Sequence, residues 1–250
     1  MYRLQPEHLN ERPVMKRKPC LTEHCDTCAF RGKAVLCDLE GDNLAEFQNI
    51  KHSLDYAPRQ TVFYEGHSCL GLYLLCRGKV KLTRSSARGQ RQIVRILGPG
   101  ELIEKQGFGE RALHEVTCET LEPSQVCVID KERYLALIHR NPQLAIKLIQ
   151  LLSNEHGVNM DQLDQFTFKA ARERLASLLL ELGDRFGGES ADRVQVGLML
   201  KREEIAEMAG ITVETAIRLL RVFRDEGLLT IEGRAITLLN PDRLARIARR

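Results

Sequence analysis

Four cysteines near the start of the chain have a spacing suited to binding a metal centre. They follow the pattern Cys-x4-Cys-x2-Cys-x8-Cys and are Cys20, Cys25, Cys28 and Cys37. Two thiolates separated by two residues can reach one metal centre from a tight turn, and further cysteines complete the ligand set. Lysines and arginines flank this run and would offset the charge of the thiolates. The pattern predicts a metal centre, with a zinc site or an unmetallated thiol switch as alternatives to an iron-sulfur cluster.

The other cysteines and the histidines give weaker signals. Cys69 and Cys76 stand within or beside apolar runs, where a cysteine most often behaves as a small buried hydrophobe, so we assign them no function. His24, His114 and His156 are not paired at metal-ligand spacing, so no haem site is predicted. Because the chain has 8 cysteines and no secretion signal, we expect reduced thiols and a cytoplasmic protein.

Residues 201–224 have the pattern of a helix-turn-helix. Gly210 can adopt the left-handed conformation that ends a first helix, and Thr212 can cap a second one. Ala206 is small where the two helices must approach each other closely. The cap leaves free N–H groups of the second helix directed outward. A hairpin pattern at 228–238 follows and would form a wing, so the segment predicts a winged helix-turn-helix.

The second helix of this motif carries charged side chains that can read DNA. Arg218, Arg221 and Arg224 recur every three residues and can meet phosphates, and Arg218 can also reach a guanine edge. Glu214 lies one turn earlier, where its carboxylate can accept a hydrogen bond from cytosine. The alternative is a solvated charged surface on a helical subdomain. We predict DNA binding because the Thr212 cap, the turn between the two helices with its Gly210, and the wing hairpin occur together.

The elements that must position these residues follow from a change of pattern along the chain. Residues 51–129 contain short alternating apolar runs separated by turn residues, which predicts a β-sandwich or β-barrel. After Asp130 helical spacing takes over, and an interrupted apolar stripe extends over about seven turns. The stripe consists of Leu144, Leu148, Leu151, Leu152, Leu163 and Phe166. A helix of this length between two domains predicts a dimer interface, with packing against the β-domain as the alternative.

Composition places the chain among ordinary globular proteins. Of its 250 residues, 43% are hydrophobic and 28% are charged, so the chain can bury one large core or two smaller ones. The net charge of +3 is too small to indicate nucleic-acid binding by itself. No stretch approaches the roughly 20 apolar residues of a membrane span. The sequence shows no Walker loop, Ser-His-Asp arrangement or His-Glu-x-x-His motif, so we do not expect an enzyme.

Two stretches of the sequence resemble the CRP/FNR family of transcription regulators. They are Thr212-Val213-Glu214-Thr215 with the following Arg218-Leu219-Leu220, and the upstream run Ala171-Arg172-Glu173-Arg174-Leu175-Ala176. The resemblance covers nearly the whole chain. It implies an α+β fold with an N-terminal β-roll sensor domain of the cyclic-nucleotide-binding kind, a long dimerisation helix and a C-terminal winged helix-turn-helix. The boundaries we expect are 1–45 for the cysteine-rich segment, 46–135 for the β-roll, 136–169 for the helix and 170–250 for the DNA-binding domain.

The resemblance to the FNR branch also implies the kind of metal centre. In that branch an oxygen-labile 4Fe-4S cluster is held by three N-terminal cysteines and a fourth from the β-roll. The implied ligands here are Cys25, Cys28, Cys37 and Cys127, because residues 121–127 resemble the stretch that carries the fourth ligand. The loop between Cys28 and Cys37 is longer than in FNR, so Cys20 remains an alternative to Cys37. Cys118 remains an alternative to Cys127.

The same resemblance implies how DNA is bound. Six residues are expected at the interface: Thr212, Glu214, Thr215, Ile217, Arg218 and Arg221. Glu214 and Arg218 would read bases. Ile217 stands where the FNR branch usually has serine, and its side chain can contact a thymine methyl but cannot hydrogen-bond a base. A two-fold homodimer would place two such helices about one DNA turn apart, which predicts a palindromic operator in double-stranded DNA. RNA polymerase is an expected partner.

A cyclic nucleotide is the alternative ligand of the sensor domain. The run Gly107-Phe108-Gly109-Glu110-Arg111 resembles the phosphate-binding cassette of CRP. Alignment backwards from Cys127 places His114, and not Arg111, at the position of the phosphate-binding arginine. We therefore predict an oxygen- or redox-responsive regulator whose cluster promotes dimerisation and operator binding.

Overall fold

The computed structural model describes residues 39–104, 112–187 and 194–249, and the N-terminal cysteine run lies outside this part. Its first unit is a β-roll made of two antiparallel sheets of four strands, with strand orders β1-β8-β3-β6 and β2-β7-β4-β5. The strands are β1 (Lys51–Tyr56), β2 (Thr61–Phe63), β3 (Gly71–Arg77), β4 (Val80–Ser85), β5 (Arg91–Leu97), β6 (Leu102–Glu104), β7 (Thr117–Thr120) and β8 (Ser124–Asp130). The predicted β-domain is confirmed.

Strand β3 shows why the β-roll has two apolar cores. Its side chains alternate between the two faces of the sheet, and both faces are buried. Leu75 packs into the core between the sheets, whereas Leu72 and Leu74 face the opposite side. That second side is covered by three helices: α1 (Gly41–Ile50), α2 (Lys131–Arg140) and α3 (Gln143–Phe168). We call this second core the helix-covered core.

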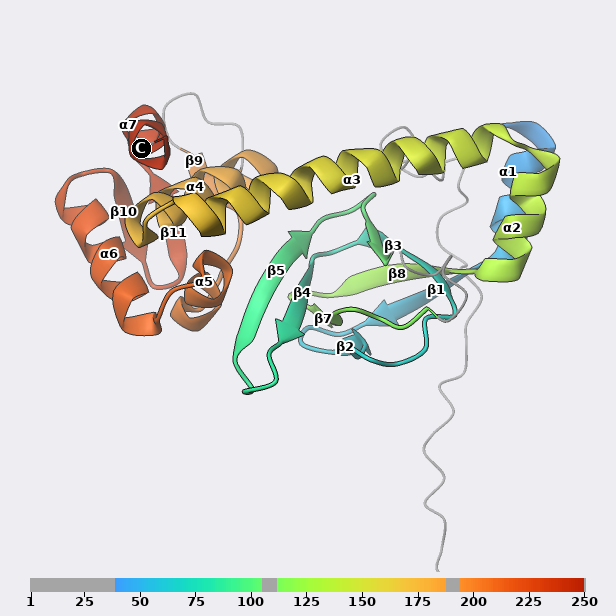
Figure 1. Cartoon of the computed structure of the whole chain (residues 1–250), viewed down its shortest axis with the longest axis horizontal. Coiled ribbons are helices and arrows are strands. Elements are labelled where there is room, and N and C mark those ends of the chain that lie inside the picture. Colours follow the sequence, from blue (N-terminus) through green and yellow to red (C-terminus); the bar gives the residue numbers. More distant parts are fainter. Residues whose placement is uncertain (1–38, 105–111, 188–193, 250) are drawn as a thin grey trace, which may run out of the picture.

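The expected dimerisation segment, 136–169, contains a break. Helix α2 is capped by Asp130, whose carboxylate accepts from the backbone N–H of Arg133 at 3.0 Å. It ends before Asn141 and Pro142, and α3 then continues for 26 residues. Proline lacks the N–H that would continue the first helix, but its fixed φ suits the start of the next. Helix α3 runs along the β-roll as far as the C-terminal unit (Figure 1).

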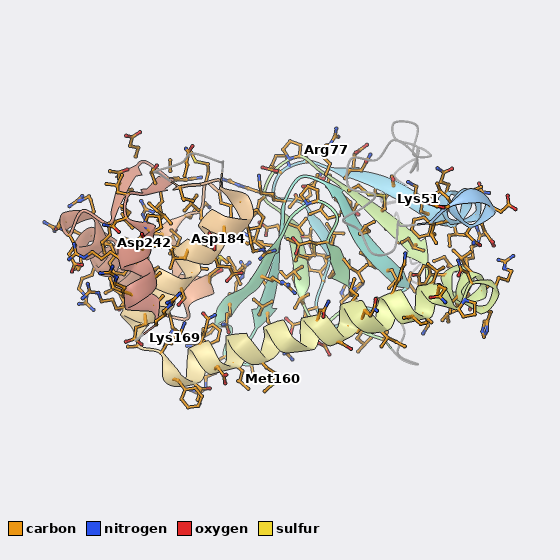
Figure 2. The ribbon with its side chains drawn as sticks, turned by 90° about the horizontal axis from the view of Figure 1, so that it is seen from above. Lys51, Arg77, Met160, Lys169, Asp184 and Asp242 are labelled. Carbon is orange, nitrogen blue, oxygen red and sulfur yellow. A yellow bond between two sulfur atoms is a disulfide. The ribbon has the colours of Figure 1, made fainter. Side chains whose placement is uncertain are left out.

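The apolar stripe predicted on this helix divides between two faces. Leu144 and Leu148 are buried in the helix-covered core, as the intramolecular alternative required. A second set of apolar side chains on α3 is exposed: Ile146, Ile149, Leu152, Met160, Leu163 and Phe166. Figure 2 shows α3 along one edge of the molecule, with Met160 near the middle of its free side. The helix therefore packs on its own β-roll and also presents an apolar face outward.

The C-terminal unit is a winged helix-turn-helix. Its elements are α4 (Ala171–Phe186), β9 (Val194–Val196), α5 (Arg202–Ala209), α6 (Val213–Asp225), β10 (Leu229–Glu232), β11 (Ala235–Leu238) and α7 (Pro241–Ala248). The predicted hairpin forms as β10 and β11, and β9 adds a third strand beside β11. The core of this unit also includes Ile93 and Ile96 of β5, so the two units share apolar contacts. Among the described helices, none is long and apolar enough to cross a membrane.

Candidate DNA interface and sensor cysteines

The turn between α5 and α6 has the predicted geometry. Gly210 adopts the left-handed conformation with φ of 61°, and the N–H of Ile211 donates to the carbonyl of Ala206 at 3.1 Å. Thr212 caps α6, because its hydroxyl accepts from the backbone N–H of Thr215 at 3.2 Å. Ala206 is fully buried, which allows the close approach of the two helices. The sequence therefore predicted this corner correctly.

Helix α6 separates a packing face from an outward face. Ala216, Leu219, Leu220 and Phe223 are buried in the C-terminal core. The residues expected at DNA are mostly on the outward face: Thr212, Glu214, Ile217, Arg218 and Arg221 are exposed and Thr215 is half-buried. A recognition helix in a major groove presents the side chains near its N-terminal end to the base edges in this way.

The three arginines of α6 differ in their surroundings. Arg224 donates to Asp225 at 2.9 Å, and Arg221 lies 3.8 Å from the other oxygen of the same carboxylate. Arg218 makes no ion pair with any of the side chains that the structure describes. Its guanidinium is therefore the one of the three that can meet DNA without first leaving a carboxylate.

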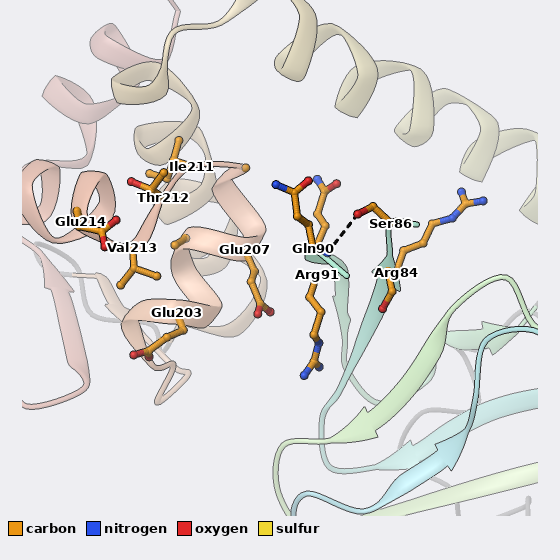
Figure 3. A pocket seen from close by; sticks show the side chains of 14 residues that line it. Arg84, Ser86, Gln90, Arg91, Glu203, Glu207, Ile211, Thr212, Val213 and Glu214 are labelled. Atoms are coloured by element: carbon orange, nitrogen blue, oxygen red, sulfur yellow. Dashed lines mark hydrogen bonds between the residues drawn. The ribbon is translucent and has the colours of Figure 1, made fainter. Parts of the chain in front are cut away.

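The hairpin between β4 and β5 faces the start of α6 across a hollow of about 890 Å³. Arg84 and Arg91 come from the hairpin, while Glu203 and Glu207 come from α5 on the opposite wall (Figure 3). The hairpin turn is held by Ser86, whose hydroxyl accepts from the backbone N–H of Gln90 at 3.1 Å. The charges on the two walls are of opposite sign, which favours this relative placement of the two units.

A buried ion-pair network joins the β-roll to the helix-turn-helix. The Lys81 ammonium on β4 lies 2.8 Å from Glu204 on α5 and 2.9 Å from Glu119 on β7. Burial alone lowers the pKa of Lys81, but hydrogen bonds and attraction from the two carboxylates outweigh it, so this pKa lies above its ordinary value. Burial by itself would raise the pKa of Glu204. Hydrogen bonds from Lys81 and from the backbone N–H of Lys201 outweigh burial, so this pKa lies below its ordinary value. Sequence patterns gave no signal for this network.

Arg174 and Phe166 connect the end of α3 to the turn between α5 and α6. The Arg174 guanidinium donates to the carbonyls of Ala209 at 2.9 Å, of Gly210 at 3.1 Å and of Lys169 at 2.8 Å. The central carbon of this guanidinium lies 5.9 Å from the centre of the Phe166 ring. These contacts link the end of α3 to the turn that precedes α6.

Of the four predicted cluster ligands, Cys127 is the one that the structure describes; Cys25, Cys28 and Cys37, like the alternative Cys20, lie outside the described residues. Cys127 is on β8, 3% exposed, and is joined to Cys76 of β3 by a disulfide. Its sulfur also lies 3.1 Å from the hydroxyl of Ser53.

The remaining cysteines lie elsewhere in the β-roll. Cys118, the alternative to Cys127, belongs to the core between the two sheets, whereas Cys127 belongs to the helix-covered core. Cys69 is buried, and its thiol lies 3.2 Å from the carbonyl of Gly71. Cys76, to which we assigned no function, is half-buried, and its sulfur is bonded to that of Cys127. Within 39–104, 112–187 and 194–249 no three metal-binding side chains come together.

The position compared with a phosphate-binding arginine holds an aromatic cluster. His114 is 3% exposed and stacks on Phe63 with the ring centres 3.8 Å apart. Tyr73 meets the same histidine edge-on at 5.3 Å. The whole run from Gly107 to Arg111 lies outside the described residues. His114 therefore serves the packing of the β-roll interior.

Comparison with known proteins agrees with this architecture. Residues 173–247 match the family model of the Crp-like helix-turn-helix domain, and residues 53–141 match that of the cyclic nucleotide-binding domain. The fumarate and nitrate reduction regulatory protein of Escherichia coli (strain K12) is 30% identical over 226 residues, which are 90% of each chain. The chain belongs to the CRP/FNR family. It is therefore a DNA-binding transcription regulator and not an enzyme, as the sequence predicted.

Solved structures of other proteins have the same fold. FixK2 from Bradyrhizobium japonicum superposes with a TM-score of 0.69 at 24% identity, over 79% of this chain and 97% of its own. CLP from Xanthomonas campestris, a c-di-GMP responsive global regulator, superposes with a TM-score of 0.70 at 22% identity, over 80% of this chain and 99% of its own.

Proposed function

We propose that this regulator is an oxygen- or redox-responsive homodimer whose 4Fe-4S cluster, held by Cys25, Cys28, Cys37 and Cys127, promotes dimerisation and binding to an inverted-repeat operator. When bound, the cluster supplies an inorganic link that oxygen can destroy. The protein would act in the cytoplasm together with RNA polymerase.

One observation about packing carries this proposal. Cys127 shares the helix-covered core with Leu39, the first described residue after the cysteine run, and with Leu144 and Leu148 of α3. A group anchored on Cys127 and on the N-terminal cysteines would therefore act on the core that supports the long helix. Ser53 supports the fit to a cluster, because its hydroxyl can donate to a Cys127 thiolate from 3.1 Å.

The exposed face of α3 suits a second copy of the same helix. Ile146 and Met160 are 48% and 47% exposed and lie two heptads apart, while Ile149 and Leu163 are 61% and 57% exposed and also lie two heptads apart. These two columns correspond to the a and d positions of a coiled coil. Two parallel α3 helices would bury these side chains and place the two α6 helices symmetrically.

The energy required of the cluster is modest. A dimer contact strengthened by about 2–3 kcal/mol changes dimer population and operator occupancy by roughly 30- to 150-fold. On the DNA, Arg218 and Glu214 would contact bases and Arg221 would contact a phosphate. Thr212 and Thr215 at the start of α6 would face the sugar-phosphate backbone of the DNA.

Anaerobic purification tests the proposal. We expect the wild-type chain to contain iron and acid-labile sulfide, to absorb in the visible range and to lose colour, dimer and operator affinity in air. Cys25→Ser should lose the same properties without air, whereas Cys69→Ser should keep them. A colourless protein that contains zinc, or a Cys25→Ser variant with full operator affinity, would rule out the cluster.

A further inference from the structure

We propose that Cys76 and Cys127 form a reversible disulfide that withholds Cys127 from the cluster when the chain is oxidised. The cluster can then be assembled only after this bond is reduced. The proposal rests on the function proposed above, in which Cys127 is a ligand. It assigns a redox role to Cys76, which lies outside the predicted ligand set.

The strand register explains why these two cysteines meet. On β8, Cys127 lies opposite Leu74 of β3, and the pairing register shifts between Leu75 and Arg77. Cys76 is the residue at this irregularity, two positions beyond Leu74 and so on the same side of the strand. The two α-carbons are 6.4 Å apart, within the range that a disulfide bridges.

The two sulfur atoms differ in access. Cys127 is 3% exposed and is enclosed between β1 and β3, next to Ser53. Cys76 is half-buried and is followed by Arg77, whose side chain is 72% exposed and which Figure 2 shows at the edge of the β-roll. A thiol or peroxide from solution therefore meets Cys76 first.

The oxidising step balances with a peroxide as the oxidant. The Cys76 thiolate attacks the hydroxyl oxygen of the peroxide and the O–O bond breaks. Cys76 becomes a sulfenic acid, and the other oxygen leaves as hydroxide or alkoxide and takes up a proton to give water or an alcohol. The Cys127 thiol then attacks the Cys76 sulfur and water leaves. Two thiols have lost two electrons and the peroxide has gained them.

The reducing step is thiol-disulfide exchange. A thiolate from solution attacks the Cys76 sulfur, the bond to Cys127 breaks, and Cys127 leaves as a thiolate. The Ser53 hydroxyl lies within hydrogen-bonding distance of that sulfur and stabilises the leaving thiolate. A second thiol then resolves the mixed disulfide on Cys76. Cys127 is available as a ligand once the first exchange has broken its bond to Cys76.

Thiol labelling tests the disulfide in the full-length apo-protein. After treatment with hydrogen peroxide, unfolding and alkylation, we expect Cys127 of the wild type to resist labelling and to become fully labelled after treatment with millimolar dithiothreitol. In Cys76→Ser, Cys127 should be labelled in both cases, and Cys69→Ser should behave like the wild type. Full labelling of Cys127 in the peroxide-treated wild type would overturn the proposal, as would a bond that the dithiol leaves intact under native conditions.

Cluster assembly tests the consequence. Peroxide-treated and phosphine-reduced samples, freed of reagents, are given ferrous iron and sulfide without oxygen, and initial iron binding is compared because sulfide itself slowly cleaves disulfides. We expect the oxidised wild type to lose this initial uptake and Cys76→Ser to bind iron equally in both samples. Equal uptake by both wild-type samples would contradict the proposal. Failure of the cluster hypothesis itself would look different, since the reduced wild type would then bind no iron.

Discussion

At the scale of single residues, the arginines of α6 have different capacities to bind DNA because one carboxylate competes for two of them. Asp225 holds Arg224 at 2.9 Å and attracts Arg221 from 3.8 Å, whereas Arg218 faces outward without such a partner among the described side chains. An arginine that must leave a carboxylate gives up part of what it gains at a phosphate.

Replacing Arg218 by alanine should therefore weaken operator binding more than replacing Arg224. We expect Arg218→Ala to cost about 1–3 kcal/mol and to relax specificity at one base pair. Arg224→Ala should cost less and reduce affinity uniformly across sequences. Binding titrations at one fixed salt concentration, with operator and scrambled DNA, separate the two effects. Equal losses for both variants would show that the ion pair with Asp225 does not matter.

Ile217 predicts a different kind of base contact. Its side chain is 51% exposed on the outward face of α6, one position before Arg218. Burial of one thymine methyl against it is worth about 0.8 kcal/mol. Uracil in place of each operator thymine in turn should weaken wild-type binding by about this amount at one position, and Ile217→Ser should abolish that sensitivity. A wild-type protein insensitive to every uracil substitution would remove Ile217 from the interface.

At the scale of elements, the corner before α6 depends on a glycine for two separate reasons. Gly210 has φ of 61°, and a Cβ built there would lie 2.7 Å from the Phe166 ring at the end of α3. The first reason is backbone strain and the second is a steric conflict between two helices. Gly227, with φ of 69° and nothing within 4 Å of its Cβ position, shares only the first reason.

The pair of glycines allows the two costs to be measured separately. Gly227→Ala should lose about 1 kcal/mol of stability from backbone strain. Gly210→Ala should lose about 1–3 kcal/mol more, because overpacking displaces the Phe166 ring. Urea unfolding gives both values, and Phe166→Leu combined with Gly210→Ala should recover part of the difference. Equal losses for the two alanine variants would mean that Phe166 yields without cost.

The elements whose rules are local were predictable, and those that depend on distant contacts were not. The cap at Thr212, the turn at Gly210 and the wing hairpin are encoded within a few residues each. Strand β9 is too short to show a pattern and exists because β11 offers it an edge. Likewise Arg174 and Cys76 gain their roles from partners more than thirty residues away. A pattern read over a few neighbouring residues cannot include partners so far away in the sequence.

At the scale of the whole molecule, the β-roll and the C-terminal unit are held together by ion pairs as well as by apolar contacts. Lys81 is 9% exposed and Glu204 14%, so their 2.8 Å contact is little screened by solvent. Arg185 on α4 adds a second link, since it donates to Glu101 at 2.9 Å and to the carbonyl of Ile96. These charged contacts add to the apolar contacts of Ile93 and Ile96 in holding the β-roll against the C-terminal unit.

The link through Glu204 should depend on pH in a defined direction. Since the hydrogen bonds from Lys81 and Lys201 hold the folded-state pKa of Glu204 below its ordinary value of 4.5, the stabilisation is present above that pH and is lost as the pH falls through the folded-state pKa. Lys81 has the opposite sign, because its pKa is raised above 10.5 and its contribution is lost only as the pH rises through the raised value. The contact is therefore at full strength throughout the neutral range.

Glu204→Gln isolates this contribution, with Glu203→Gln on the same helix as the control. At neutral pH we expect Glu204→Gln to reduce the free energy of unfolding by about 1–3 kcal/mol, the usual worth of a charged hydrogen bond. The difference from the wild type should shrink as the pH falls from about 4.5 through the lowered folded-state pKa, because the wild-type carboxyl becomes neutral over that range. Urea unfolding at several pH values measures it, and Glu203→Gln should show little change because that side chain is exposed. A difference between Glu204→Gln and wild type that stays constant down to acidic pH would mean that packing, and not charge, holds α5 against the β-roll.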